Sequence, residues 1–306
     1  MFLTATPNGR AVRAHLPPRR RRSRRRANAQ VVLAAAIIAA VALVSLLAPV
    51  VAPYDPDLAD GSIKYLGPGE QGHLLGTDEQ GRDILSRLIW GGRTSLIVAF
   101  LASAAATVIG SLLALVAGLS DDRVAGLSDD RVAGLIMRTV DIMFAFPVIM
   151  IALVFAVLLG PGTPVVVLSI VFSAVPYVAR VIFAEVKLQR GREYVEAAES
   201  LGSGFLAIVF REVLPNVAGQ IVVYGTGLVG GMIVFSSSLS ALGIGVQPPT
   251  ADWGRMISEG AKVIITGNVY PALLPGLVVL VVALAFNWLG DGLRDVFDPH
   301  TRRADR

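Results

Sequence analysis

Residues 31–51 read VVLAAAIIAAVALVSLLAPVV, an apolar run that contains no charged side chain. The nearest charged residues on either side are Arg26 and Asp55. A helix of about 20 residues crosses the roughly 30 Å hydrocarbon core of a bilayer. The run therefore predicts a membrane-spanning helix.

The composition agrees with a membrane protein. Of the 306 residues, 54% are hydrophobic and only 16% are charged, and the mean hydropathy is +0.65, which excludes an ordinary soluble enzyme fold. The chain has no cysteine, which excludes disulfides, thiolate nucleophiles and cysteine-ligated zinc or iron–sulfur clusters. The net charge of the chain is +4, but the residues before the first apolar run contain nine arginines, so the rest of the chain is net acidic. These arginines are Arg10, Arg13, Arg19, Arg20, Arg21, Arg22, Arg24, Arg25 and Arg26.

Further apolar runs predict five more spanning helices. The stretch 142–179 is too long for one helix, and the Gly/Pro-rich residues 160–164 divide it into a third and a fourth span. The other spans are expected at 95–119, 217–242 and 272–289. The fold class is therefore an all-α polytopic membrane protein with six transmembrane helices and both termini on the same side.

The arginine cluster predicts which side. Arginines close to the first span are retained in the cytoplasm, so both termini are expected there. A cleaved signal peptide is disfavoured, because the apolar core is long and Pro53 follows the small-residue site at Ala52. The expected organisation is a cytoplasmic tail at 1–30, a first spanning helix at 31–52, an extracytoplasmic segment with an interfacial helix at 53–93, a five-helix core at 94–290 and a cytoplasmic tail at 291–306.

The inside loop 186–216 is longer than a simple connection requires and carries charges of both signs. Helix-forming residues run as far as Leu201, and Gly202-Ser203-Gly204 interrupts them. This predicts a short helix, a sharp turn and a second helix that enters the membrane. Such an element could seat in a groove on a cytosolic partner, or it could lie on the membrane surface as an amphipathic connector.

This loop resembles a known element. Glu196-Ala197-Ala198, followed by Gly202 and Leu214-Pro215, is similar to the "EAA" loop of the membrane subunits of bacterial ATP-binding-cassette importers. The resemblance implies that these residues dock on the ATPase subunit.

Other motifs narrow the resemblance to the permease subunits of dipeptide, oligopeptide and nickel importers, of the dipeptide permease C type. They lie in the family's order from about residue 70 to 300: Gly76-Thr77-Asp78, Gly81-Arg82-Asp83, Ser86-Arg87, Met137-Arg138 with Phe146-Pro147, Leu242-Gly243 with Trp253-Gly254, and Gly290-Asp291-Gly292. The chain departs from the family at Ser236–Ser238, where a glutamate is common, so no role for an acidic residue in the fifth span is carried over.

The resemblance implies a type I importer permease fold in the bacterial cytoplasmic membrane and a non-catalytic role. The implied partners are a second homologous permease subunit, two cytosolic ATP-binding subunits or one fused ATPase, an extracytoplasmic substrate-binding protein and membrane lipid, with no nucleic acid. No cofactor is expected in this chain, while ATP and magnesium are expected in the ATPase. Peptides are favoured as substrates over nickel or another small solute.

The physical chemistry of individual residues predicts structural roles for several of them. Asp78 is expected to cap a helix at the outer interface, with a role in guiding substrate as the alternative. Trp253 is expected to anchor an outside turn at the interface, and Arg138 is expected to pair with Asp141. The glycines at 225–231 favour close helix packing over phosphate binding.

Two other classes of protein compete with the permease subunit. A self-sufficient secondary transporter should carry intramembrane charges, which the long apolar runs almost lack. An intramembrane enzyme is disfavoured, because no Ser–His pair, paired carboxylates or metal cluster lies at membrane depth. None of the lysines Lys64, Lys187 and Lys262 follows a glycine, so no Walker-type phosphate loop is expected.

The octapeptide 117–124 is repeated at 125–132, and the second copy is expected to be dispensable.

Overall fold

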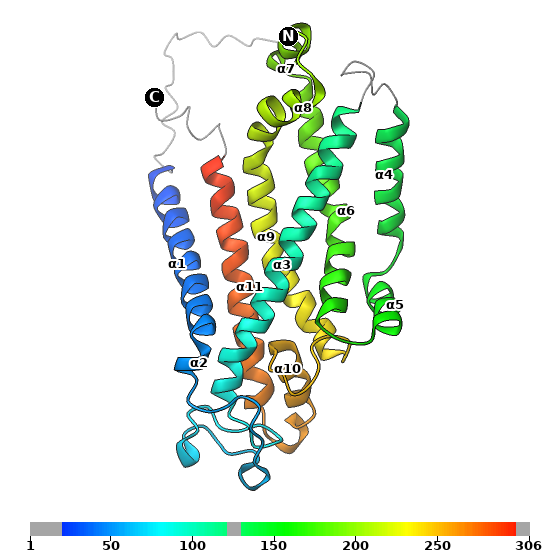
Figure 1. Ribbon diagram of the computed structural model, residues 1–306. Helices are drawn as coiled ribbons and strands as arrows, with labels where there is room; N and C mark the ends of the chain where they lie inside the picture. Colours follow the sequence, from blue (N-terminus) through cyan, green and yellow to red (C-terminus); the bar gives the residue numbers. More distant parts are fainter. Residues whose placement is uncertain (1–19, 121–129, 298–306) are drawn as a thin grey trace, which may run out of the picture.

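The computed structural model describes residues 20–120 and 130–297, and within them the chain is helical without a named β-strand (Figure 1). The helices are α1 (Arg20–Leu46), α2 (Ala48–Val51), α3 (Ile84–Leu119), α4 (Asp130–Ala145), α5 (Val148–Leu159), α6 (Thr163–Arg190), α7 (Glu193–Ser200), α8 (Phe205–Ala207), α9 (Leu214–Ala241), α10 (Trp253–Ala261) and α11 (Tyr270–Phe297). Single 3-10 turns lie at Gly61–Ile63, Glu70–Gly72 and Ile264–Thr266, and a π-helical turn at Ile208–Val213 joins α8 to α9.

Five helical segments of the described chain are long and apolar enough to cross a membrane: Ala29–Leu46, Ile84–Leu119, Thr163–Arg190, Phe205–Ala241 and Tyr270–Val296. The consecutive helices α4 and α5 pass the same test together but are bent by 88°. The predicted count of six is reached when this bent pair is taken as one span.

The third span, expected from residue 142 up to the break at 160–164, starts earlier and is bent. It begins at Asp130 in α4, breaks after Ala145 and resumes at Val148 in α5. Pro147 explains the break, because proline has no N–H to donate and disfavours helical geometry at the preceding residue. The predicted division between the third and fourth spans is confirmed, with Gly160 at φ 78° between α5 and α6.

Helix α3 also differs from its predicted bounds. It begins at Ile84, well before the expected start near residue 95, and runs without interruption to Leu119. The interfacial helix expected within 53–93 is therefore the first part of α3 and not a separate element. The first octapeptide copy continues α3 only as far as Leu119, and most of the second copy lies outside the described residues.

Glycines let the long helices approach closely. A Cβ added at Gly230 of α9 would lie 2.8 Å from the carbonyl oxygen of Ala283 in α11. Added at Gly110 of α3, it would lie 2.7 Å from the Cβ of Val178 in α6. The prediction that glycines of the fifth span allow close helix packing is confirmed at Gly230. Helices in lipid associate mainly through close packing rather than the hydrophobic effect, and small residues let their backbones approach.

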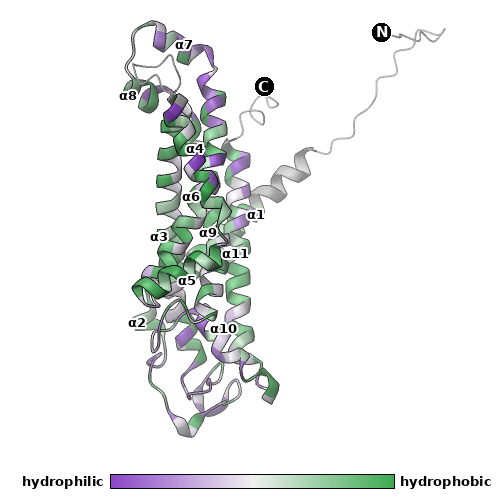
Figure 2. Cartoon of the chain, turned by 90° about the vertical axis from the view of Figure 1, so that its right-hand side faces the viewer, coloured by the Kyte–Doolittle hydropathy of each residue, from purple (hydrophilic) through white to green (hydrophobic). Residues whose placement is uncertain are grey.

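The bundle has two distinct ends. Helices α7 and α8 lie at one end, where α1 begins and α11 finishes, and this is called the α7 end (Figure 1). Helix α10 and the segment between α2 and α3 cover the other, the α10 end. Apolar residues dominate the length between the ends, and hydrophilic residues gather at both (Figure 2).

Candidate functional site

The predicted helix, turn and helix of the loop 186–216 is confirmed. Helix α7 ends in a turn at which Gly202 adopts φ 81°, a left-handed conformation that favours glycine. The N–H of Gly202 donates to Glu199 O at 2.9 Å, and the N–H of Ser203 donates to Ala198 O at 3.0 Å. This is the double hydrogen bond of a Schellman cap, so the turn is built into the backbone.

One face of α7 holds it to the bundle. Val195 is fully buried in an apolar cluster with Val186 of α6 and Ile208 and Val213 of the π-helical turn. Tyr194 packs on the same cluster and donates its hydroxyl to Gln189 Oε1 at 2.9 Å. These contacts fix the orientation of α7 relative to α6 and α9.

The opposite face of α7 is not covered in this way by any of the residues that the structure describes. Glu196 and Ala197 are exposed, and Leu201 is 86% exposed just beyond the helix. Leu206 of α8 is 67% exposed. Carboxylates beside bare leucines at the tip of a fixed hairpin make a surface suited to a partner protein.

The structure brings most of the predicted docking residues together. Glu196, Ala197, Ala198 and Gly202 lie within the one hairpin. The other two lie at the start of α9, where Leu214 packs against the apolar cluster below α7 and Pro215 is exposed.

The predicted motif before the second span forms a folded cap at the α10 end. Thr77 accepts a hydrogen bond from Leu66 N at 2.9 Å and donates one to Ile63 O at 2.5 Å. Gly76 is buried against the backbone of Leu66. Gly81 has φ 77°, and an added Cβ would overlap the carbonyl oxygen of Asp60. The motif glycines therefore let two loop segments touch backbone to backbone.

The helix cap is Asp83, which corrects the expectation for Asp78. Asp83 accepts a hydrogen bond from Ser86 N at 2.7 Å at the start of α3, and His73 Nδ1 lies 2.9 Å from its other oxygen. Asp78 instead closes the preceding turn, accepting from the backbone N–H groups of Gln80 at 2.8 Å and Arg82 at 3.0 Å.

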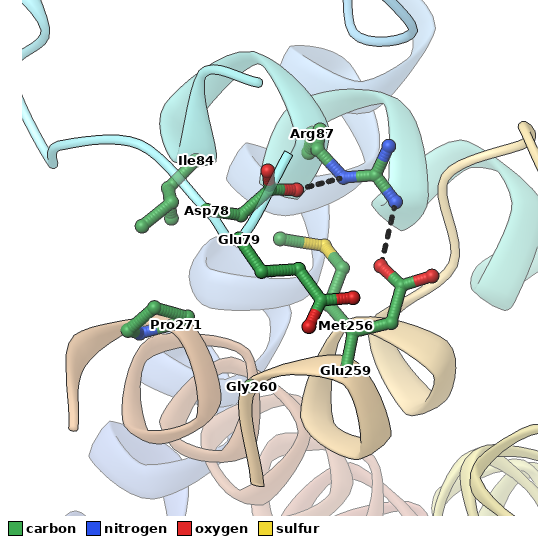
Figure 3. Close-up of a pocket in the computed structure, with 8 residues that line it drawn as sticks. All are labelled: Asp78, Glu79, Ile84, Arg87, Met256, Glu259, Gly260 and Pro271. Atoms are coloured by element: carbon green, nitrogen blue, oxygen red, sulfur yellow. Dashed lines mark hydrogen bonds and ion pairs between the residues drawn. The ribbon is translucent and has the colours of Figure 1, made fainter. Parts of the chain in front are cut away.

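The expected surface helix is wrong, because the motif's charged residues are buried. Arg82 is 2% exposed and Arg87 is 1% exposed. Arg82 donates to Asp78 at 2.7 Å and to Glu259 of α10 at 2.7 Å, and Arg87 reaches the same Glu259 oxygen at 3.4 Å. Figure 3 shows Arg87 between Asp78 and Glu259 at the edge of a small cleft. The carboxylates balance both arginines and tie α3 to α10.

Trp253 is a second correction, because it is core rather than an interfacial anchor. It is 1% exposed, packs against Gly91 and Gly92 of α3 and donates its indole N–H to Leu88 O at 2.9 Å. The side chain of Asp252 caps α10 by accepting from Arg255 N at 3.2 Å.

Ser95 donates to the carboxylate of Asp252 at 2.7 Å across the gap between α3 and α10. Burial raises the pKa of Asp252, and the hydrogen bond from Ser95 opposes that rise. Glu259, Asp252 and Ser95 were not predicted from the sequence. No local signal pointed to Glu259, because Asp78 and Asp83 already lie beside the two arginines in the sequence and Glu259 follows them by 177 and 172 residues.

The pairing expected between Arg138 and Asp141 is also different. Asp141 accepts from Arg180 of α6 at 2.5 Å, so this ion pair joins two helices. In the described part of the chain, no group of three or more His, Asp or Glu side chains could hold a metal ion.

These features define a polytopic α-helical membrane protein with an exposed helical hairpin at one end and, at the other, a folded cap that buried ion pairs hold to the bundle. Residues 110–303 match the family described as "Binding-protein-dependent transport system inner membrane component". The chain belongs to this family, the permease subunits of ATP-binding-cassette importers.

Similar proteins include permeases with named substrates. The chain is 39% identical over 269 residues to the Di/tripeptide transport system permease protein DppC of Pseudomonas aeruginosa, covering 86% of each chain. It is 35% identical to the Dipeptide transport system permease protein DppC of Haemophilus influenzae, covering 86% of this chain and 88% of that one. It is 37% identical to the Glutathione transport system permease protein GsiD of Escherichia coli, covering 84% and 82%.

A solved structure shares the fold. A chain of the MetNI methionine ABC transporter in an inward-facing conformation matches with a TM-score of 0.58 and 17% identity. The match covers 70% of this chain and 98% of that one. The type I importer permease fold implied by the sequence motifs is confirmed.

Proposed function

We propose that this chain forms half of the translocation path of an importer for di- or oligopeptides. The observation that carries the substrate class is the 39% identity to a di/tripeptide permease over 86% of both chains. The similarity to a glutathione permease supports the same class, because glutathione is itself a tripeptide. Nickel or another small solute is the alternative within the same architecture.

The proposed role of the α7 hairpin is to dock on a cytosolic ATPase. Two features support it: the buried Val195 fixes the hairpin to α6 and α9, and the outer face with Glu196 and Ala197 is exposed. A rigid element of this kind can transmit movement of a docked partner to two spanning helices. The coupling requires that nucleotide favour one arrangement of the ATPase pair and that this arrangement favour one tilt of the helices.

The proposed assembly contains a second homologous permease subunit, two ATP-binding subunits or one fused ATPase, and an extracytoplasmic substrate-binding protein. ATP and magnesium would bind to the ATPase, and this chain would carry no chemistry. The α7 end would face the cytoplasm with both termini, as the amino-terminal arginines favour. The α10 end would face the binding protein.

Uptake by the reconstituted importer tests the substrate class. The chain is co-reconstituted in liposomes with its partner permease, ATPase and binding protein, with ATP enclosed on the ATPase side. Radiolabelled dialanine should accumulate only when ATP and the binding protein are both present. ATP-dependent uptake of nickel without uptake of dialanine or glutathione would contradict the peptide assignment. Dialanine uptake by this chain alone would contradict the role as a subunit.

A further inference from the structure

An ion pair lies where the broken span bends. Asp141 is in the last turn but one of α4, just before the 88° bend into α5, and its partner Arg180 is on α6. Arg180 is about 26 Å along α6 from Thr163 and about 15 Å from Arg190, at 1.5 Å per residue. Since the hydrocarbon core is about 30 Å thick, the pair lies near its boundary on the side of the α7 end, with about 15 Å of α6 continuing beyond it.

Two aromatic rings complete this group. The guanidinium of Arg180 lies over the ring of Phe144, 4.5 Å from its centroid. Phe144 meets Tyr177 edge to face at 4.7 Å. Asp141, Phe144, Tyr177 and Arg180 are together called the α4–α6 polar patch.

The patch faces out of the chain. The side chains of Arg180 and Asp141 are 53% and 55% exposed, and Tyr177 is 51% exposed. Charges at this depth avoid the hydrocarbon, and those on spanning helices mostly face a bundle interior, a water-filled cavity or the membrane interface. The surface that this chain presents at the patch therefore faces water or polar groups in the assembled transporter.

The polar character continues along α6 toward the α7 end. Ser173, Tyr177, Arg180 and Lys187 follow one another at spacings of four, three and seven residues, which places them on one helical face. Tyr177, Arg180 and Lys187 are exposed and Ser173 is partly exposed. With the exposed Ala184 between Arg180 and Lys187, these residues give α6 a largely polar face from the bend toward the helix end, which is suited to line a translocation path.

The local backbone supports the same interpretation. Broken spanning helices place free backbone groups at the binding sites of other transport proteins, because half-helix ends attract charged parts of a solute. In this chain α4 ends at Ala145 and α5 begins at Val148, immediately beside the ion pair. The bend and the pair are independent observations at one place.

We propose that the α4–α6 polar patch lines the translocation path and contacts the charged ends of a passing peptide. Arg180 offers guanidinium donors to the peptide carboxylate, and Asp141 offers its carboxylate to the peptide ammonium group. The pair is neutral as a whole, which suits a zwitterion of zero net charge. Phe144 and Tyr177 present aromatic faces to the backbone and side chains between. This inference rests on the proposed peptide function.

A charge swap separates contact with substrate from a purely structural pair. The double variant Asp141→Arg with Arg180→Asp keeps an ion pair but exchanges its ends. If the pair only holds α4 to α6 or to a second subunit, the swap should restore dialanine uptake relative to Arg180→Gln. If it contacts the peptide, assembly and ATP hydrolysis should stay within about twofold of the unaltered importer, while uptake stays at least tenfold lower. Restored uptake in the swap would overturn the proposal.

Arg93→Gln is the matched control. Arg93 is also an exposed arginine beside an aromatic ring, 5.9 Å from the centroid of Trp90, but it lies on α3 near the α10 end. Its replacement should leave dialanine uptake within about twofold. An equal loss in Arg93→Gln and Arg180→Gln would show a general effect of removing arginine and would contradict the proposal.

Thiol labelling tests the path without depending on transport or on the solute. The chain lacks cysteine, so Tyr177→Cys introduces a single thiol. Ile109→Cys is matched in depth, because the adjacent Gly110 packs against Val178, and Ile109 is an exposed apolar residue. A charged methanethiosulfonate should modify Tyr177→Cys in the assembled importer at least tenfold faster than Ile109→Cys. A thiol at 177 that reacts no faster than the one at 109 would overturn the proposal, whichever solute the importer carries.

Discussion

At the scale of single residues, the α10 end depends on a few buried charges. Arg82 and Arg87 share Glu259, and Asp78 supplies a second carboxylate. A buried ion pair adds little compared with an apolar pair of similar size, but removing one member leaves an unbalanced buried charge. Each of these residues is therefore far more sensitive to substitution than an exposed residue of the same type.

Glu259→Gln should destabilise the protein. The change removes the carboxylate that Arg82, Arg87 and Arg255 share and leaves Asp78, with the more exposed Asp57, to balance the two buried arginines. The loss of one member of a buried pair costs about 3 kcal/mol. The measurement is thermal unfolding of the purified chain in detergent. Glu79→Gln is the control, because Glu79 borders the same cleft but is only partly buried, and its effect should be under about 0.5 kcal/mol. Equal effects of the two variants would contradict the importance of the network.

Ser95→Ala should make the stability of the protein more dependent on pH. Without the hydrogen bond from Ser95, the pKa of Asp252 rises further above its ordinary value of 3.8. A carboxyl whose pKa is raised on folding holds its proton more tightly in the folded state, so stability falls as pH rises through that pKa. The loss should be about 2 kcal/mol at pH 8 and smaller near pH 4, where the carboxyl with the raised pKa is protonated in the folded state. Unfolding in detergent at both pH values measures it, and an equal loss at both would refute the assignment.

At the scale of elements, the α7 hairpin and the α4–α5 bend are set by short local signals. A glycine in the left-handed region ends α7, and a proline divides the third span. The two breaks have different consequences. The first leaves a compact hairpin outside the bundle, and the second leaves an ion pair beside a gap in a spanning helix.

Gly202→Ala should weaken association with the ATPase. Gly202 has open space around it, so the cost arises from the left-handed backbone alone and is about 1 kcal/mol, or roughly fivefold in affinity if docking needs this turn. Gly204→Ala is a matched control with equal space but φ −72°, and it should have no effect. Co-purification with the ATPase measures both variants.

Glu196→Lys tests the face of the same hairpin. It reverses the charge at an exposed position without altering the buried side, so the chain should insert normally while docking weakens. If Gly202→Ala and Glu196→Lys both co-purified with the ATPase as well as the unaltered chain, the docking role would be refuted.

At the scale of the whole molecule, the two ends are built differently. The α7 end carries both ends of the described chain and the hairpin, whereas the α10 end is closed by buried charges and loop contacts (Figure 1). The proposed orientation gives the first the cytoplasm and the second the binding protein. The apolar length between them matches a membrane (Figure 2).

Single cysteines should report the orientation. Ser203→Cys lies in the hairpin at the α7 end, and Thr250→Cys lies in an exposed turn before α10. Intact cells treated with an impermeant thiol reagent, with the outer membrane permeabilised where one is present, should be labelled at position 250 and not at 203. Lysed cells should be labelled at both. Labelling of position 203 in intact cells would contradict the proposed orientation.

The sequence by itself determined the elements that depend on neighbouring residues. Apolar length predicted the spans, Gly160 and its neighbours predicted the division between the third and fourth, and Gly202 predicted the hairpin, because hydropathy and turn chemistry act over a few residues. The loop around Glu196-Ala197-Ala198 and the motifs from Gly76 onward supported the resemblance that the family match confirmed.

Only the tertiary structure decided which distant residues meet. Arg82 pairs with Glu259 across 177 residues, and Arg180 pairs with Asp141 across 39. Neither pairing follows from local pattern, so Arg82 was expected at a surface and Asp141 was expected to pair within its own helix. The physical reason is that the partner of a charge depends on how long helices pack and cross. That arrangement is fixed by close contacts over the whole bundle and not by the sequence beside the charge.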